Sequence, residues 1–228
     1  STGNALFFHL NGADCDGPVV AALQEVCAEQ NRRQAKVHHL ERALLRRGLS
    51  PDAYFEAAKQ EKKRKELRRQ KNRLVETGEL AFTRSNNGDG LEDWTNDFLA
   101  LERCGWKGAA GSALDCADET RSLFREALVG AAKRDMLERL DLRLDGKPLA
   151  MLVNFMRSPG AFSYKTAFDE ALARFSPGVL LQIENLALLN REDTNWCDSC
   201  AAEGHPMIDS LWTDRRAIGR YSVAIGGA

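Results

Sequence analysis

The feature that most constrains the fold is a change in hydrophobic period after residues 115–133, which repeat at helical spacing. Over residues 137–144 and 149–157 the period changes to the two residues that are typical of strands. Asp145-Gly146 lies between these runs, and this dipeptide is typical of a tight hairpin corner. The pattern therefore predicts an antiparallel hairpin in the second half of the chain.

Further elements follow the hairpin. Residues 161–168 form a third strand candidate, and Ser176-Pro177-Gly178 predicts the start of a helix, with Ser as N-cap and Pro at the first helical position. Hairpin strands followed by a crossover helix and another strand predict a mixed sheet with helices on both faces, an α/β fold. We expect the remaining strands over residues 5–10, 37–40, 79–84, 195–200 and 217–225, and the remaining helices over 16–30, 51–76, 91–103 and 206–212.

The charge is distributed unevenly, although the formal net charge is −1. Residues 59–73 hold nine basic and two acidic residues, a local charge of +7, so the rest of the chain has 23 basic and 31 acidic groups. Leu67 is the only apolar residue in this segment and Leu74 directly follows the segment, which predicts a helix with one buried stripe and a solvated basic surface. An anion-binding surface for phosphates, nucleic acid or an acidic glycan is the alternative.

Several classes of protein are excluded or disfavoured. No apolar run approaches the length of a membrane span, and no signal peptide begins the chain, so we expect a cytoplasmic protein. Six cysteines in 228 residues are too sparse for a disulfide scaffold. Gly-x-Ser-x-Gly and Walker-type loops are absent, which disfavours hydrolases and NTPases.

An ordered set of short motifs carries a family resemblance over roughly residues 55–225. Together they resemble the GNAT-superfamily, FemAB-like acyltransferases that include the cellulose-biosynthesis (CelD-type) group. The motifs are Lys63-Arg64-Lys65-Glu66-Leu67-Arg68-Arg69-Gln70, Phe98-Leu99-Ala100-Leu101-Glu102 leading to Gly105-Trp106-Lys107-Gly108, Gly111-Ser112-Ala113, Asp145-Gly146-Lys147-Pro148-Leu149-Ala150, Tyr164-Lys165-Thr166-Ala167-Phe168-Asp169, Phe175-Ser176-Pro177-Gly178-Val179-Leu180-Leu181 and Asp198-Ser199-Cys200-Ala201.

The resemblance implies a GNAT-like fold whose splayed central strands admit the pantetheine arm of acyl-CoA. Because members often carry two such domains, residues 1–55 are expected to be the trailing part of a first, truncated GNAT-like unit. Residues 56–78 would form a basic connecting helix, and residues 79–228 the acyltransferase domain. The abrupt start at Ser1 fits a chain that lacks part of its native N-terminus.

Acyl transfer from a thioester needs a phosphate-binding element, an activated acceptor and stabilisation of an oxyanion. The helix start Ser176-Pro177-Gly178-Val179 would offer backbone N–H groups to a pyrophosphate. Arg174 lies beside it, but Arg174 and Gly178 do not match the spacing of the GNAT Arg/Gln-x-x-Gly-x-Gly/Ala loop. An ordinary capped helix is the alternative.

The acceptor site is expected from two further motifs. Trp106 and Lys107 lie on a glycine-bounded loop, and Trp106 is alternatively a buried core residue. The resemblance implies that Tyr164 and Lys165 face the substrate groove, with Tyr164 as general acid and Asp169 nearby. The alternative is that Tyr164 is a structural residue of the strand with a hydrogen-bonded hydroxyl.

Two residues are candidates for the general base. Asp198 ends the strand after the expected cofactor helix, where α/β sheets place functional groups, and is expected to act as the base or to bind the acceptor amine. His205, in the next loop, is the alternative base because imidazole side chains commonly transfer protons in enzymes. Cys197 and Cys200 with His205 supply too few ligands at finger spacing, so no metal site is expected.

The sequence thus predicts an acyltransferase that moves an acyl group from acyl-CoA to an amine or hydroxyl by direct transfer. The acceptor would be a small molecule or a cell-envelope or polysaccharide precursor. Two alternatives stay open: aminoacyl transfer from a charged tRNA bound by the basic helix, and a non-catalytic GNAT-like scaffold. The oligomeric state is not encoded in any pattern that we recognise.

Overall fold

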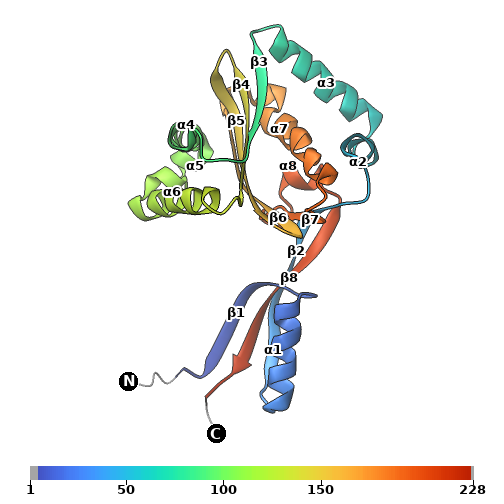
Figure 1. Cartoon of the computed structure of the whole chain (residues 1–228). Coiled ribbons are helices and arrows are strands. Elements are labelled where there is room, and N and C mark those ends of the chain that lie inside the picture. Colours follow the sequence, from blue (N-terminus) through green and yellow to red (C-terminus); the bar gives the residue numbers. More distant parts are fainter. Residues whose placement is uncertain (1–4, 227–228) are drawn as a thin grey trace.

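The computed structural model describes residues 5–226, and its central element is an eight-stranded sheet with helices on both faces (Figure 1). The strands follow the order β1-β8-β2-β7-β6-β5-β4-β3, in which only β6 and β7 pair in parallel among the described strands. This mixed sheet confirms the predicted fold class. The strands are β1 (Phe7–Asp14), β2 (Gln34–Arg46), β3 (Leu80–Ser85), β4 (Leu137–Leu144), β5 (Lys147–Arg157), β6 (Gly160–Phe168), β7 (Trp196–Asp198) and β8 (Asp214–Ala224).

The predicted hairpin is the pair β4–β5. Its corner residues Asp145 and Gly146 have φ angles of 49° and 77°, so both lie in the left-handed region. That combination defines a type I′ turn, whose twist matches that of the flanking strands. The Asp-Gly signal in the sequence therefore located the corner correctly.

The helices divide between the two faces of the sheet. In Figure 1, α4, α5 and α6 cover one face, and α2, α3, α7 and α8 lie on the other. The helices are α1 (Pro18–Glu29), α2 (Pro51–Ala58), α3 (Glu61–Val75), α4 (Leu91–Cys104), α5 (Trp106–Ala109), α6 (Asp118–Ala132), α7 (Pro177–Asn185) and α8 (Pro206–Asp209), with 3-10 turns η1 (Leu114–Cys116), η2 (Glu170–Phe175) and η3 (Leu186–Asn190).

Alternating side chains of the hairpin strands enter two separate cores. Met151 and Val153 of β5 pack under α4 and α6, against Phe98 and Phe124. The intervening Leu152 faces the opposite way, into a core with residues of α3 and α7. This period of two fixes which side chains of β5 and of its neighbour β6 face each layer of helices.

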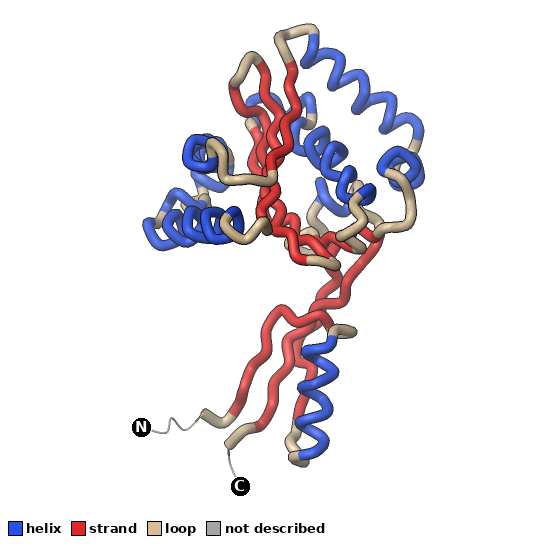
Figure 2. The backbone as a smooth tube through the Cα atoms, in the orientation of Figure 1, coloured by secondary structure: helices blue, strands red, loops and turns tan. Residues whose placement is uncertain are grey.

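The N-terminal strands are part of the same sheet. The C-terminal strand β8 lies between β1 and β2, and these three strands project as an arm with α1 beside it (Figure 2). Strand β2 also pairs with β7, next to the centre of the sheet. The expected units 1–55 and 79–228 therefore interleave in one sheet, and their origin as two GNAT-like units stays a prediction.

The basic connecting helix predicted over residues 56–78 is not continuous. Lys59 adopts an extended conformation (φ −125°, ψ 132°), which ends α2, and α3 begins at Glu61. The break lets α2 bury Tyr54 in the core near η3, while α3 packs Leu74 against the sheet. Leu67 and Leu74 are 1% and 0% exposed, so the predicted buried stripe of the basic segment is confirmed.

Candidate functional site

The only parallel strand pair among the described residues opens into a gap. Residues 160–162 of β6 pair with residues 196–198 of β7, after which β7 ends and β6 continues to Phe168. Gly160 permits this junction because a Cβ there would overlap the Trp196 ring at 2.1 Å. Beyond Phe162, the edge of β6 that faced β7 therefore has no strand partner in the described chain, and polar backbone groups there are open to a ligand.

A β-bulge shapes β6 beside this gap. Asn154 of β5 pairs with Ser163 and Val153 pairs with Lys165, so Tyr164 is the extra residue. The bulge places two consecutive side chains, Tyr164 and Lys165, on the α4–α6 face, where Tyr164 stacks on Phe124 with a centroid distance of 6.4 Å. Ser163 and Thr166 consequently face α7.

A cavity of about 620 Å³ occupies the gap, a volume within the usual range for small-molecule sites. Side chains from both faces of the sheet line it. The predicted residues that line it are Trp106, Lys107, Tyr164, Lys165, Ser176, Pro177, Gly178, Val179 and His205. Trp106 is 61% exposed, so the alternative of a buried core residue is wrong for it.

Two lysines give the α4–α5 side of the cavity its charge. Lys107 Nζ and Lys165 Nζ lie 3.1 and 3.0 Å from Glu102 Oε1, and the Glu102 side chain is 1% exposed. The backbone N–H of Leu114 donates to Glu102 Oε2 at 2.9 Å. One buried carboxylate thus holds two ammonium groups, and no Asp or Glu from the described residues lines the cavity. The local net charge of +1 favours anionic or electron-rich groups of a ligand.

The first turn of α7 forms the opposite wall. Ser176 occupies the N-cap position with φ 53°, but its side chain makes no capping bond, so that part of the predicted cap is wrong. Gly178 is needed for close packing, since a Cβ there would lie 2.9 Å from Met207 Sδ and 3.1 Å from Phe168 Cδ1. The N–H groups of Gly178 and Val179 begin the helix, where backbone donors and the helix dipole favour an anion.

Ser163 adds an unpaired polar group to the cavity wall. The residue is 3% exposed, and its Oγ has no hydrogen-bond partner within the described part of the chain. A buried hydroxyl without a partner is costly, so an incoming ligand atom that bonds to it gains stability.

His205 lines the cavity and also caps α8. Its Nδ1 accepts a hydrogen bond of 3.5 Å from the N–H of Ile208. In the neutral ring, this bond leaves the proton on Nε2. In that tautomer, the Nε2–H group is the one that can donate to a ligand.

Cys200 also lines the cavity, but burial raises the pKa of its thiol from an ordinary 9.0 to about 11. We therefore expect alkylation of Cys200 by iodoacetamide at pH 7.5 to be about 100-fold slower than alkylation of an unperturbed thiol. The exposed Cys104 and Cys116 provide internal references. Peptide mass spectrometry of a timed reaction measures these rates, and Cys200 reacting as fast as Cys104 would show that the thiol is not shielded.

Asp198 lies outside the cavity, contrary to its expected role as base. It is 1% exposed, and its carboxylate lies 3.4 Å from Arg42 Nη1 and 3.2 Å from Arg216 Nη1. The N–H of Cys200 donates to it at 2.8 Å. With two arginines and a backbone donor already bound, this carboxylate has a structural explanation, and we do not propose it as the base.

Two other predicted residues also lie away from the cavity. The Arg174 guanidinium stacks on the neighbouring Phe175 ring, 4.7 Å from its centroid. The Asp169 carboxylate accepts a hydrogen bond of 2.9 Å from the N–H of Ala171 and so begins η2. Their contacts are local, so the expected phosphate and substrate contacts find no support in the cavity lining.

Sequence reasoning missed Thr166 and Gln182 in the cavity wall, and Glu102, which lies behind the two lysines of that wall. Glu102 closes one of the family-like motifs, and its place at the end of an otherwise apolar helical stripe was the available signal. Thr166 and Gln182 meet at the cavity, where Gln182 Nε2 donates to Thr166 Oγ1 at 3.2 Å. Nothing local in the sequence marks that pair, because it joins a strand to a helix.

A scan against protein families matches residues 61–214 to the family described as Acetyltransferase (GNAT) domain. The match spans more than half of the chain, and the protein therefore belongs to this family. No curated protein matches the sequence.

Solved structures share the fold at low sequence identity. FemX matches with a TM-score of 0.66 and 9% identity over 97% of this chain and 72% of FemX. A conserved protein of unknown function from Bacteroides thetaiotaomicron matches with a TM-score of 0.60 and 13% identity, over 96% of this chain and 69% of that protein. The C-terminal domain of an Agrobacterium fabrum protein described as a lysylphosphatidylglycerol synthetase matches with a TM-score of 0.56 and 16% identity. The match covers 96% of this chain and 68% of that domain. These neighbours show that the chain shares their fold.

Two searches of the described residues found nothing. No helix there is long and apolar enough to cross a membrane. No group of three or more His, Cys, Asp or Glu side chains is arranged to hold a metal ion.

Proposed function

We propose that this protein transfers an acyl group from acyl-CoA directly to an amine or hydroxyl of a small acceptor. The observation that carries the proposal is the cavity in the gap between β6 and β7, with a helix N-terminus on one side and two lysines on the other. Such an opening connects the two faces of the sheet, so donor and acceptor can meet from opposite sides.

The donor would enter from the α7 side. The N–H groups of Gly178 and Val179 suit a pyrophosphate, and the unpaired edge of β6 suits the amides of a pantetheine arm. The donor supplies an acyl group already activated as a thioester.

The acceptor would lie on the α4–α5 side. Trp106 offers an exposed aromatic face, and Lys107 and Lys165 attract its polar or anionic groups. A glycan or cell-envelope precursor, as in the cellulose-biosynthesis group of this family, fits such a wall. Since acyl-CoA is a cytoplasmic metabolite, we propose that the reaction takes place in the cytoplasm.

The chain's own residues then move the protons. The acceptor nitrogen or oxygen attacks the thioester carbon, a C–N or C–O bond forms and the C–S bond breaks. Tyr164, 40% exposed, would donate its hydroxyl proton to the departing sulfur. His205 Nδ1 would take the proton of the acceptor as its cap on α8 opens. The high pKa of Cys200 disfavours a covalent enzyme intermediate and supports direct transfer.

Calorimetric titration of acetyl-CoA into the full chain tests the donor. We expect saturable 1:1 binding, which Gly178→Leu should abolish because its side chain would meet Phe168 and Met207 at the cradle. Thr120→Ala, on the opposite face in α6, is a control that should bind normally. Absence of binding at millimolar acetyl-CoA would refute the proposal.

Aminoacyl transfer from tRNA is the second candidate, and one observation favours it. The basic helix α3 lies on the same side of the sheet as α7 (Figure 1). Its residues Arg68 and Arg69 are exposed. This candidate predicts tRNA binding that weakens steeply with salt and is lost in Arg68→Gln/Arg69→Gln. The open cavity argues against the third candidate, a scaffold whose gap would be filled by Trp or Phe side chains.

A further inference from the structure

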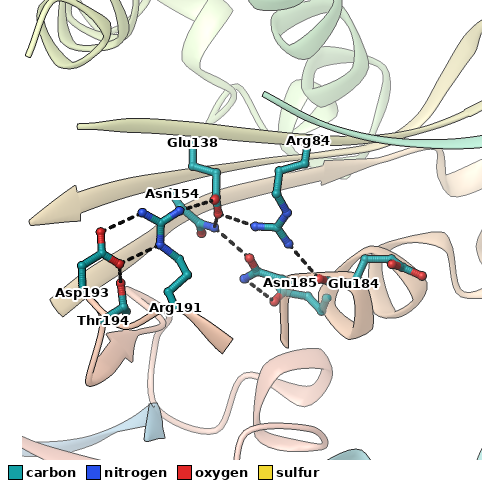
Figure 3. Close-up of polar contacts among 9 residues, drawn as sticks. Arg84, Glu138, Asn154, Glu184, Asn185, Arg191, Asp193 and Thr194 are labelled. Atoms are coloured by element: carbon teal, nitrogen blue, oxygen red, sulfur yellow. Dashed lines mark hydrogen bonds and ion pairs between the residues drawn. The ribbon is translucent and has the colours of Figure 1, made fainter. Parts of the chain in front are cut away.

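A chain of buried polar side chains runs from β4 to the cavity. Its inner end is Glu138 of β4, whose side chain is 1% exposed (Figure 3). Arg84 Nη1 donates to Glu138 Oε1 at 2.5 Å, and Arg191 Nη1 lies 3.6 Å from Oε2. Two guanidinium groups therefore face the Glu138 carboxylate, and carboxylate oxygens accept hydrogen bonds.

The carboxylate fixes the orientation of the next amide. Asn154 Nδ2 donates to Glu138 Oε1 at 3.0 Å and to Asn185 Oδ1 at 2.7 Å (Figure 3). Turning the amide of Asn154 round would point its oxygen at the carboxylate, which is repulsive. Asn154 and Asn185 are both 0% exposed, so no solvent relieves an incorrect orientation.

The orientation passes from residue to residue toward the cavity. Asn185 Oδ1 accepts the hydrogen bond from Asn154, so the Nδ2 of Asn185 faces Gln182. This Nδ2 donates to Gln182 Oε1 at 3.4 Å. Gln182, 1% exposed, then has its Nε2 toward the cavity and donates to Thr166 Oγ1 at 3.2 Å. A hydroxyl that accepts this bond has its own proton free to point elsewhere.

Thr166 lines the cavity on the α7 face, as does Ser163 with its unpaired hydroxyl. We propose that Thr166 Oγ1 is an oriented hydrogen-bond donor to a carbonyl oxygen of the acyl donor's pantetheine arm. Glu138, Asn154, Asn185 and Gln182 are then positioning residues that keep the hydroxyl proton directed into the cavity. This inference rests on the proposed use of the cavity by acyl-CoA.

The polar chain is not explained by stability alone. Burying a carboxylate and three amides costs desolvation, and apolar side chains of similar size often stabilise a core as well or better. The desolvation cost is explained if these buried polar side chains have a function.

Acetyl-CoA titrations of four variants test the inference. Thr166→Val should weaken binding about 3- to 10-fold, and Thr166→Ser should restore it to within about 2-fold. Glu138→Gln, which can donate as well as accept, should also weaken binding. In the double variant, Glu138→Gln should add no further loss to Thr166→Val, whereas a merely structural role for Glu138 would weaken binding equally in both backgrounds.

The side-chain amide spectrum of Gln182 tests the orientation without any ligand. In the wild type, we expect protected Nε2 protons, assigned by their loss in Gln182→Met, and Glu138→Gln should shift them. An unchanged Gln182 signal in Glu138→Gln would overturn the inference. If the wild type binds no acetyl-CoA, both the proposed function and the proposed carbonyl partner of Thr166 are wrong. The Gln182 signal still tests the orientation of the Thr166 hydroxyl in that case.

Discussion

Val179→Asp should weaken acetyl-CoA binding by about 30- to 700-fold without destabilising the protein. Val179 is the third residue of α7, is half-buried and lines the cavity. A carboxylate there would lie near the proposed pyrophosphate and repel it by roughly 2–4 kcal/mol at the effective dielectric of a partly buried site. Calorimetric titration of the variant with acetyl-CoA measures the loss.

The loss of affinity in Val179→Asp should not come from a loss of folding. The first turn of α7 has no acidic residue, and an aspartate there should stabilise the helix by about 0.3–1 kcal/mol through the helix dipole. Val179→Asn, with the same shape and no charge, is the matched control and should lose less than about 10-fold in affinity. Equal affinities of Val179→Asp and Val179→Asn would mean that the phosphates do not bind at α7.

Asp198→Ala should lower the free energy of unfolding by about 3–5 kcal/mol. The substitution leaves the guanidinium groups of Arg42 and Arg216 without their shared carboxylate, and those side chains are only 24% and 12% exposed. For a domain of this size, we expect the melting temperature to fall by roughly 6–20 °C. Thermal unfolding followed by circular dichroism measures the change.

A matched control and a kinetic readout distinguish this structural role from general base catalysis. Asp118 pairs with Arg121 at the surface, its side chain is 84% exposed, and Asp118→Ala should cost less than about 1 kcal/mol. Well below its melting temperature, Asp198→Ala should retain turnover per folded molecule within a few-fold. Undiminished stability together with abolished turnover would identify Asp198 as the base after all.

Local signals made much of the fold predictable. The Asp145-Gly146 corner, the period of two in β4 and β5, and the start of α2 depend on residues close in sequence. At the start of α2, the Ser50 side chain accepts a hydrogen bond of 3.3 Å from the N–H of Ala53, which is a local contact.

The rest could not be predicted because it depends on distant partners. Strand β2 is 13 residues long, far longer than the run 37–40, because β8 pairs with residues 34–44 and β7 with residues 44–46. Asp198 stood where α/β sheets often place catalytic groups, but Arg42 and Arg216, opposite each other on β2 and β8, fill its surroundings.

The candidate site also contains some residues with a local sequence signal and others without one. The family-like motifs identified the residues of the cavity rim, from Trp106 and Lys107 to His205, since each lies within a short motif or loop. The bulge at Tyr164 and the polar chain ending at Thr166 arise from pairing between strands and from contacts of α7 with the sheet. Such contacts have no signature in a single sequence.

The position of coenzyme A in a crystal of the complex tests the central claim most directly. We predict the pantetheine arm between β6 and β7, with a carbonyl oxygen near Thr166 Oγ1 and the pyrophosphate at the N–H groups of Gly178 and Val179. Coenzyme A bound instead along α3, where Arg64, Arg68 and Lys71 line a second cavity of about 230 Å³, would contradict the account.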